Sequence, residues 1–378
     1  MSGGLTADLL FAYVGIITTA TVSIYAGSFG TLPKPQGPKE TSDEDKDEDD
    51  SPLRLTAEDA WTFPVLGSTL LGGLFLAIKY FGKEWINWLL SLYFALAGLY
   101  SVPRSLTSLA RFTLGSQRWN NFEKVFEFRI FKHERVIVCI SCRSPSLLLV
   151  PLGMIPSFIY IFYSGPTKSI LLSNILALSL GHQAMSLLKI DSFRTGAILL
   201  SGLFLYDVWW VFGTKVMVSV ATSLDLPMKI LWPKSTRFSL EHGTMMLGLG
   251  DIVVPGTFVS LALRYDHFRH TMAQQEKPFA KPYFVASVVA YVTGLATTMV
   301  VMHVYKAAQP ALLYLSPACI LSFVFTAWYR GELSEAWQWN DGAAATSQNG
   351  SADAKAASDA AGGGTPEPSD TKSDTVDS

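Results

Sequence analysis

The stretch Thr195-Gly-Ala-Ile-Leu-Leu-Ser-Gly-Leu-Phe-Leu-Tyr-Asp-Val-Trp-Trp-Val-Phe-Gly-Thr214 is the most informative part of this 378-residue chain. It is twenty residues long and carries one charged side chain, Asp207. A helix of roughly 20 mostly apolar residues is long enough to cross the hydrocarbon core of a membrane. The stretch therefore predicts a membrane-spanning helix with a carboxyl group inside it.

Eight further windows share this apolar character. Charged residues make up 16% of the chain, whereas a soluble domain has about a quarter. The nine windows run over Leu9–Pro33, Ala60–Ile78, Trp85–Pro103, Ser144–Thr167, Ser169–Leu188, Thr195–Thr214, Gly243–Leu263, Pro282–Tyr305 and Ala307–Tyr329. Seven windows contain no Lys, Arg, Asp or Glu, and the sixth and seventh contain one each, Asp207 and Asp251. We predict an all-α membrane protein with nine transmembrane helices.

Charge and cysteine content exclude other classes of protein. The formal net charge of −2 gives no basic excess for nucleic acid. Three cysteines are too few for a disulfide-stapled secreted scaffold. Cys139 and Cys142 form a C-x-x-C motif without a second pair, so no metal site is expected. No Lys or Arg precedes Lys34, so the first window lacks the basic region of a cleavable signal peptide and is expected to stay as a span.

Basic residues outside the windows predict the orientation. Twenty-one of the 29 Lys and Arg residues lie on the side of the C-terminus, which we place in the cytosol, with the N-terminus in the lumen. The cytosolic loop 104–143 mixes aromatic and basic residues and could carry an interfacial helix. The predicted organisation is 1–29, lumenal N-terminus and first helix; 30–59, acidic cytosolic linker; 60–264, helices two to seven with the lumenal loop 215–242; 265–281, cytosolic loop; 282–330, helices eight and nine; and 331–378, disordered cytosolic tail.

The two intramembrane aspartates are the strongest functional signal. A carboxylate inside the hydrocarbon costs several kcal/mol, so it is a functional hypothesis by default. No window contains a Lys or Arg to pair with Asp207 or Asp251. Asp207 lies 13 residues after Arg194, and Asp251 lies 13 residues before Arg264. On antiparallel helices six and seven, the two carboxyl groups are therefore expected to share one depth, nearer the lumen, and to meet.

Two carboxyl groups that meet in a site of low dielectric constant cannot both ionise easily. One then keeps its proton while the other stays charged. The charged group can take a proton from water while the neutral one protonates a peptide carbonyl. We therefore predict that Asp207 and Asp251 are catalytic residues of a peptide-hydrolysing enzyme that needs neither metal nor cofactor.

Residues beside the aspartates point to substrate binding. Gly248 and Gly250, with Leu249 between them, remove side chains ahead of Asp251 and allow another backbone to approach. The hydroxyl of Tyr206 is placed to orient a carboxyl group. Pro310 opens the ninth window with Ala311 and Leu312 and frees main-chain groups on the aspartates' side of the membrane.

A substrate helix must unwind before water can reach its peptide bonds, and the unwound stretch needs hydrogen-bond partners in the membrane. The segment Val216-Met-Val-Ser-Val220 is rich in β-branched residues and is expected to be extended. We therefore expect substrate to add as a strand against this segment, against the backbone near Pro310, or against both.

Three motifs resemble a known family. They are Tyr206-Asp207, Gly248-Leu-Gly-Asp251 and Pro310-Ala-Leu312, in three separate spans. Together they resemble the presenilin-type intramembrane aspartyl proteases, and among these the signal peptide peptidases most closely, over roughly residues 60–335. The resemblance implies nine helices with the aspartates on the sixth and seventh, and Pro310, Ala311 and Leu312 in the active-site environment.

The resemblance also implies substrates and location. The substrates are remnant signal peptides and single-span proteins of type II orientation, and the location is the endoplasmic reticulum membrane. Homo-oligomers and partners in membrane-protein degradation stay open. There are two alternatives. One is a proton-coupled transporter, which would be expected to show an internal repeat, and the other is a non-catalytic scaffold for signal sequences.

Overall fold

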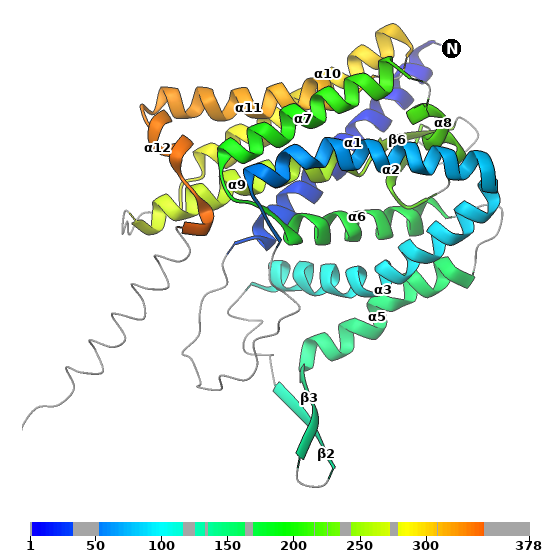
Figure 1. Cartoon of the computed structure of the whole chain (residues 1–378), viewed down its shortest axis with the longest axis vertical. Coiled ribbons are helices and arrows are strands. Elements are labelled where there is room, and N and C mark those ends of the chain that lie inside the picture. The colour runs from blue at the N-terminus through cyan, green and yellow to red at the C-terminus, as the bar shows by residue number, and fades with distance from the viewer. Residues whose placement is uncertain are drawn as a thin grey trace, which may run out of the picture.

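The computed structural model describes residues 2–32, 53–115, 125–132, 135–162, 169–214, 216–224, 226–234, 243–272, 279–307 and 309–343. This part is mostly helical, as predicted (Figure 1). The helices are α1 (Ser2–Gly30), α2 (Ala57–Phe81), α3 (Lys83–Leu114), α5 (Ser144–Phe162), α6 (Ile170–Leu187), α7 (Phe193–Phe212), α8 (Val216–Ser223), α9 (Gly250–Met272), α10 (Pro282–Tyr305), α11 (Leu312–Tyr329) and α12 (Leu333–Gln338).

Six short strands form three two-stranded sheets in addition to the helices. The pairs are β1 (Leu53–Leu55) with β4 (Leu188–Ile190), β2 (Val125–Lys132) with β3 (Arg135–Arg143), and β5 (Lys229–Pro233) with β6 (Thr244–Gly248). The first pair is parallel and the other two are antiparallel.

Seven helices of the described chain are long and apolar enough to cross a membrane. They are α1 from Asp8 onward, α2, α3, α6, α7, α10 and α11. Each coincides with a predicted window. The fourth window corresponds to α5, whose apolar part Leu149–Phe162 is shorter, and the seventh corresponds to β6 followed by α9.

The seventh window is therefore not one continuous helix. Thr244–Gly248 pairs with β5, in a register from Lys229 opposite Gly248 to Pro233 opposite Thr244. Gly243 has a positive φ of 77°, a conformation that favours glycine and does not continue a helix. The extended segment obtains its main-chain hydrogen bonds from β5, and the helix begins only at Gly250, next to Asp251.

One other expectation for local structure is wrong, and a second holds only in part. Val216–Ser223 is the helix α8 and not an extended segment, so it offers no strand edge to a substrate. Residues 104–114 of the loop 104–143 are helical, as a continuation of α3, whereas residues 125–132 and 135–143 form the β2–β3 pair. The alternation in Val125-Phe-Glu-Phe-Arg-Ile-Phe-Lys132 has the period of a strand, and it prevails over the basic and aromatic composition.

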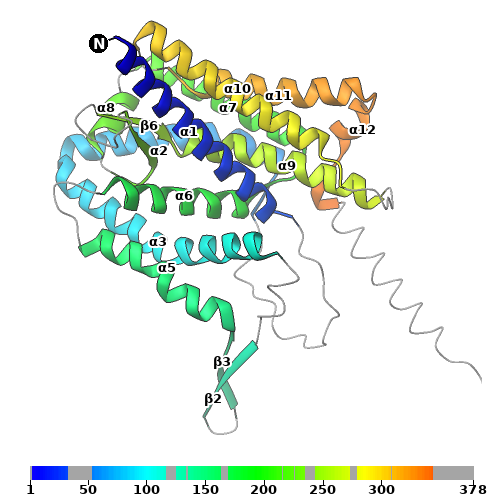
Figure 2. The same ribbon diagram turned by 180° about the vertical axis from the view of Figure 1, so that it is seen from behind.

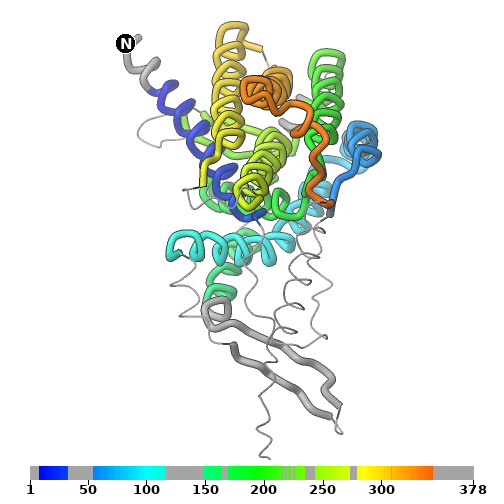
Figure 3. Tube along the Cα trace, turned by 90° about the vertical axis from the view of Figure 1, so that its left-hand side faces the viewer, coloured from blue at the N-terminus to red at the C-terminus, as the bar shows by residue number. Residues whose placement is uncertain are grey.

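The largest hydrophobic core lies where α1, α6, α7, α9, α10 and α11 meet. Figure 2 shows α1 running diagonally across α6 and α9, and it packs against both. In Figure 3 α9 is surrounded by α1, α7, α10 and α11, each of which contacts it. The residues of α9 from Ile252 to Asp266 are almost all buried, so α9 is the central helix.

The start of the predicted tail is folded. Helix α12 packs against α7 and α11, and the ring of Trp339 lies 5.1 Å from that of Tyr265. The main-chain N–H of Asp341 donates to the carbonyl of Asp191 at 2.7 Å. The expectation of disorder is therefore wrong for residues 331–343, because aromatic and charged side chains anchor them, and residues 344–378 lie outside the described chain.

Candidate active site

Asp207 lies in the last two turns of α7, and 4% of it is exposed. Its carboxyl oxygen Oδ2 accepts a hydrogen bond from the main-chain N–H of Leu312 at 3.0 Å, across 105 positions of sequence. The end of α7 and the beginning of α11 therefore meet at this carboxyl group. A main-chain donor, and not a basic side chain, stabilises the buried acid.

The Leu312 N–H is available because α11 begins at this residue. The first N–H groups of a helix have no acceptor within the helix, and Ala311 supplies no side-chain cap. Pro310, two residues earlier, has no N–H, and its ring fixes its φ angle. Pro310, Ala311 and Leu312 are all buried at the start of α11, and of the three residues Leu312 is the one whose main chain contacts Asp207.

Asp251 lies in the first turn of α9, directly after the β5–β6 sheet. A Cβ atom placed on Gly248 would lie 3.1 Å from Oδ2 of Asp251. This distance is tighter than an ordinary contact, so the absence of a side chain at Gly248 lets the carboxyl group lie over the end of β6. Gly250 has no heavy atom within 4 Å of its own hypothetical Cβ. The two glycines therefore differ, since only Gly248 makes room for Asp251.

The two aspartates lie on packed helices, since α7 contacts α9. The carboxyl group of Asp251 is half-buried and lies within electrostatic range of that of Asp207. Within the described chain, none of the ion pairs involves either aspartate. The two acids therefore lie on neighbouring helices, and neither has a basic partner among the described residues.

Two residues singled out from the sequence have side chains that pack elsewhere. The ring of Tyr206 would lie 3.4 Å from a Cβ atom placed on Gly67 of α2. Among the described residues, its hydroxyl forms no hydrogen bond with Asp207 or Asp251. A Cβ on Gly181 of α6 would lie 2.9 Å from Cδ1 of Leu249, so that leucine packs onto α6. Neither side chain is held against Asp207 or Asp251.

One buried hydroxyl near the acids was not anticipated from the sequence. Tyr291 of α10 is fully buried, and its hydroxyl has no hydrogen-bond partner among the described residues. This phenol lies within electrostatic range of the Asp251 carboxyl group. A single tyrosine in an apolar window gives no sequence signal, because most tyrosines in membrane helices pack without a role in chemistry.

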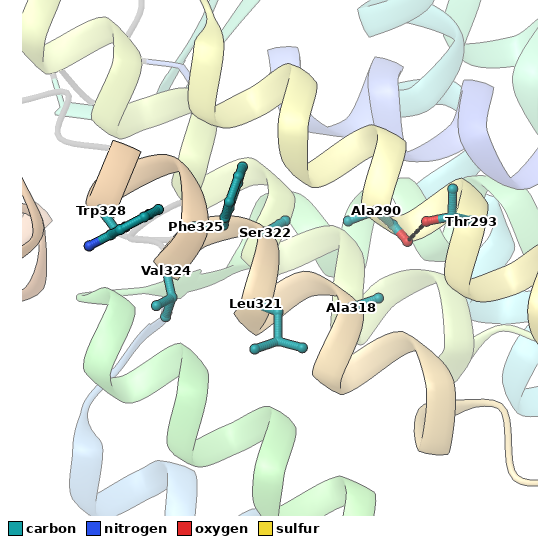
Figure 4. Close-up of a pocket in the computed structure, with 8 residues that line it drawn as sticks. All are labelled: Ala290, Thr293, Ala318, Leu321, Ser322, Val324, Phe325 and Trp328. Carbon is teal, nitrogen blue, oxygen red and sulfur yellow. Dashed lines mark hydrogen bonds between the residues drawn. The ribbon is translucent and has the colours of Figure 1, made fainter. Parts of the chain in front are cut away.

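The structure also has an open groove of about 560 Å³ between α10 and α11 (Figure 4). Its lining includes neither aspartate. The hydroxyl of Thr293 donates to main-chain carbonyls of its own helix, and that of Ser322 donates to the carbonyl of Cys319. The groove therefore presents apolar surface and has no chemistry of its own.

Comparison with known proteins gives the family. The model of the signal peptide peptidase family matches residues 45–343. Signal peptide peptidase of Homo sapiens is 34% identical over 88% of this chain and 84% of its own length, and that of Mus musculus is 33% identical over the same shares. A probable intramembrane protease of Schizosaccharomyces pombe is 38% identical over 72% of this chain and 79% of its own length.

The chain belongs to the signal peptide peptidase family. It is therefore an intramembrane protease and a multi-pass membrane protein, consistent with its seven long apolar helices. The match covers every element from α2 to α12, and hence both aspartates and the Pro310-Ala-Leu312 segment.

Proposed function

We propose that this protein is an aspartic endopeptidase that cuts peptide bonds within membrane-spanning segments, with Asp207 and Asp251 as its catalytic pair. The observation that carries the proposal is the contact between two elements distant in sequence. Asp207 accepts the Leu312 N–H while it lies in electrostatic range of Asp251. Two acids that share a site in this way divide the roles of base and acid between them.

The hydrogen bond to Asp207 supports a division of roles between the two acids. A main-chain N–H stabilises a carboxylate more than a neutral carboxyl group, so Asp207 is the charged partner and Asp251 carries the proton. Asp207 takes a proton from water as the water oxygen attacks the peptide carbonyl carbon, and Asp251 protonates the carbonyl oxygen. When the tetrahedral intermediate collapses, the proton on Asp207 passes to the leaving nitrogen and Asp251 regains its own.

The proposed substrates are remnant signal peptides and single-span segments of type II orientation in the endoplasmic reticulum membrane. The names of the human and mouse relatives support signal peptides as substrates. In the proposed topology nine helices cross the membrane, with the N-terminus in the lumen and the C-terminus in the cytosol. The excess of Lys and Arg in the loops on the C-terminal side supports that orientation.

We further propose that an unwound substrate pairs with strand β6. This strand replaces the segment Val216–Val220 as the edge that substrate would join, since that segment is helical. Strand β6 leads directly into Asp251, and Met246 at its centre is 51% exposed. A strand added at this edge would obtain main-chain hydrogen bonds and bring its peptide bonds to the acids.

The test uses purified full-length protein and a synthetic helical signal peptide, with products identified by mass spectrometry. Asp207→Asn and Asp251→Asn are each expected to lower the cleavage rate by more than about a hundredfold, because neither carboxyl group can fill the other's role. Glu84→Gln changes an exposed acid at the start of α3 and serves as the control, with the parent rate expected. Activity within tenfold of the parent in either aspartate variant contradicts the mechanism. A transporter or a scaffold would yield no products even from the parent.

A further inference from the structure

The β5–β6 sheet has two outer edges, and a side chain from a membrane helix occupies one of them. Asn174 of α6 donates from Nδ2 to the carbonyl of Leu231 at 2.7 Å. Its Oδ1 accepts the main-chain N–H of the same residue at 2.8 Å. One amide therefore satisfies both main-chain groups of a residue in β5, as a neighbouring strand would do.

The register of the sheet shows what this contact leaves free. In an antiparallel pair, opposite residues alternate between exchanging main-chain hydrogen bonds and pointing them outward. Leu231 lies opposite Met246. Since Leu231 directs both of its groups to Asn174, the N–H and C=O of Met246 also point outward, on the far side of the sheet.

Two hydrogen bonds at the ends of the sheet agree with this register. The N–H of Leu249 donates to the carbonyl of Met228 at 2.9 Å, and that of Lys234 donates to the carbonyl of Gly243 at 3.1 Å. Both pairs lie three positions from Leu231 and Met246, where bonding across the sheet is expected. On β6, the outward groups are therefore those of Thr244, Met246 and Gly248.

We propose that Asn174 is a positioning residue for the cleavage reaction. By closing the outer edge of β5, it fixes the register of the sheet on α6 and leaves β6, the strand that leads into Asp251, as the edge for substrate. The proposal rests on the proposed function. In this proposal, the side chain of Asn174 in α6 determines which peptide bond of the substrate reaches the aspartates.

The position of Asn174 supports a role in register. Its side chain is half-buried within α6, a helix that packs against β5. The outward main-chain groups of β5 recur at every second residue, so a shift of the sheet by one residue along α6 would bring groups that are bonded to β6 to the helix, whereas a shift by two would bring outward groups there again. Without the amide, the sheet therefore slips most readily by two residues relative to the helix.

The experiment measures where one substrate is cut. Purified full-length parent, Asn174→Leu and Asn174→Ser are incubated with the same synthetic signal peptide, and products are counted by mass spectrometry. Both variants are expected to lose about tenfold in kcat/KM at the parent bond, as a slipped sheet delivers other bonds to the acids. The share of cuts two residues away is expected to rise. Asn174→Ser is included in case Asn174→Leu fails to fold. A serine hydroxyl in a helix can donate to a main-chain carbonyl of that helix, so the substituted side chain is not left without a partner.

A matched control separates positioning from general stability. Asn87 of α3 also donates its amide to a main-chain carbonyl, that of Ser223, at 3.1 Å. Asn87→Leu is expected to lower the amount of folded protein at most, and to leave the distribution of products unchanged. If Asn174→Leu and Asn174→Ser keep the parent distribution, Asn174 is only structural and the inference is overturned. If the parent itself makes no products, the proposed function fails instead.

Discussion

The carboxyl group of Asp207 accepts the main-chain N–H of Leu312 at 3.0 Å. This bond joins the end of α7 to the first residue of α11. Pro310 lies just before that residue, and we expect it to act on this bond as well as to mark the start of the helix. A proline at this point keeps α11 from extending backwards. The N–H of Leu312 is thereby kept for Asp207.

Replacing Pro310 tests this relationship. Pro310→Leu is expected to let α11 begin earlier, so that the Leu312 N–H donates to a carbonyl four residues before it and no longer to Asp207. Cleavage should fall by about tenfold or more, the loss of one main-chain hydrogen bond to a charged group. Rates per folded enzyme, measured with a synthetic signal peptide, provide the check.

Pro317 is the matched control, because it lies inside the same helix and is exposed. Pro317→Leu adds a helix hydrogen bond at a position five residues beyond Leu312 and is expected to cleave at the parent rate. Normal cleavage by Pro310→Leu would show that the proline only marks the start of α11.

Gly248 gives a second prediction, about the space around Asp251. In Gly248→Ala the new Cβ would lie 3.1 Å from Oδ2 of Asp251, so the carboxyl group must move by a few tenths of an ångström. Because catalysis depends on the placement of this group, we expect a loss of about tenfold in kcat with little change in thermal stability. Steady-state kinetics on the purified variant measure both constants.

Gly73 of α2 has open space around its hypothetical Cβ, and Gly73→Ala should behave as the parent. Equal activity of the Gly248 and Gly73 variants would contradict the packing argument. Gly250→Ala is informative in another way. Its surroundings are open within the protein, so a raised KM in a folded variant would mean that substrate itself approaches this glycine.

A third prediction concerns the edge of β6. Met246→Pro removes an N–H that points away from β5, so it leaves the hydrogen bonds of the β5–β6 sheet intact. If substrate pairs with this edge, KM should rise or kcat fall by about tenfold, since a main-chain donor to the substrate is lost. Met246→Ala keeps the N–H and is the control, with cleavage near the parent rate expected. Equal rates for the two variants would exclude pairing at Met246.

The last prediction concerns the stability of the contact between α9 and the segment that follows α12. Arg264 of α9 is 5% exposed and donates to Asp341 at 2.7 Å and to the carbonyl of Ile190 at 3.0 Å. Asp341→Ala leaves a buried guanidinium without its carboxylate, at a cost of about 3 kcal/mol in the free energy of unfolding. Thermal unfolding in detergent should show a clearly lower midpoint.

Glu335→Gln removes an exposed acid from neighbouring α12. It is expected to change the free energy of unfolding by less than about 0.5 kcal/mol, as surface substitutions usually do. A midpoint for Asp341→Ala as high as that of Glu335→Gln would show that the segment after α12 does not hold α9.

The membrane class and the two acids could be predicted from the order of residues alone. Apolar windows without charge predict spans because a membrane admits few other segments. An acid inside two of those windows stands out for the same reason, so Asp207 and Asp251 could be found by reading. Counting residues from Arg194 and Arg264 predicts that the two acids lie at one depth, because a helix has a fixed rise per residue.

The groups that surround these acids depend on how the helices and strands pack in three dimensions. No local pattern could show that Thr244–Gly248 is a strand, since its hydrogen-bond partners in β5 lie more than ten residues earlier. The contact of Leu312 with Asp207, and that of Asn174 with Leu231, join residues 105 and 57 positions apart. A main-chain N–H or an amide side chain is the same in every context, and its role appears only when packing brings it to its acceptor.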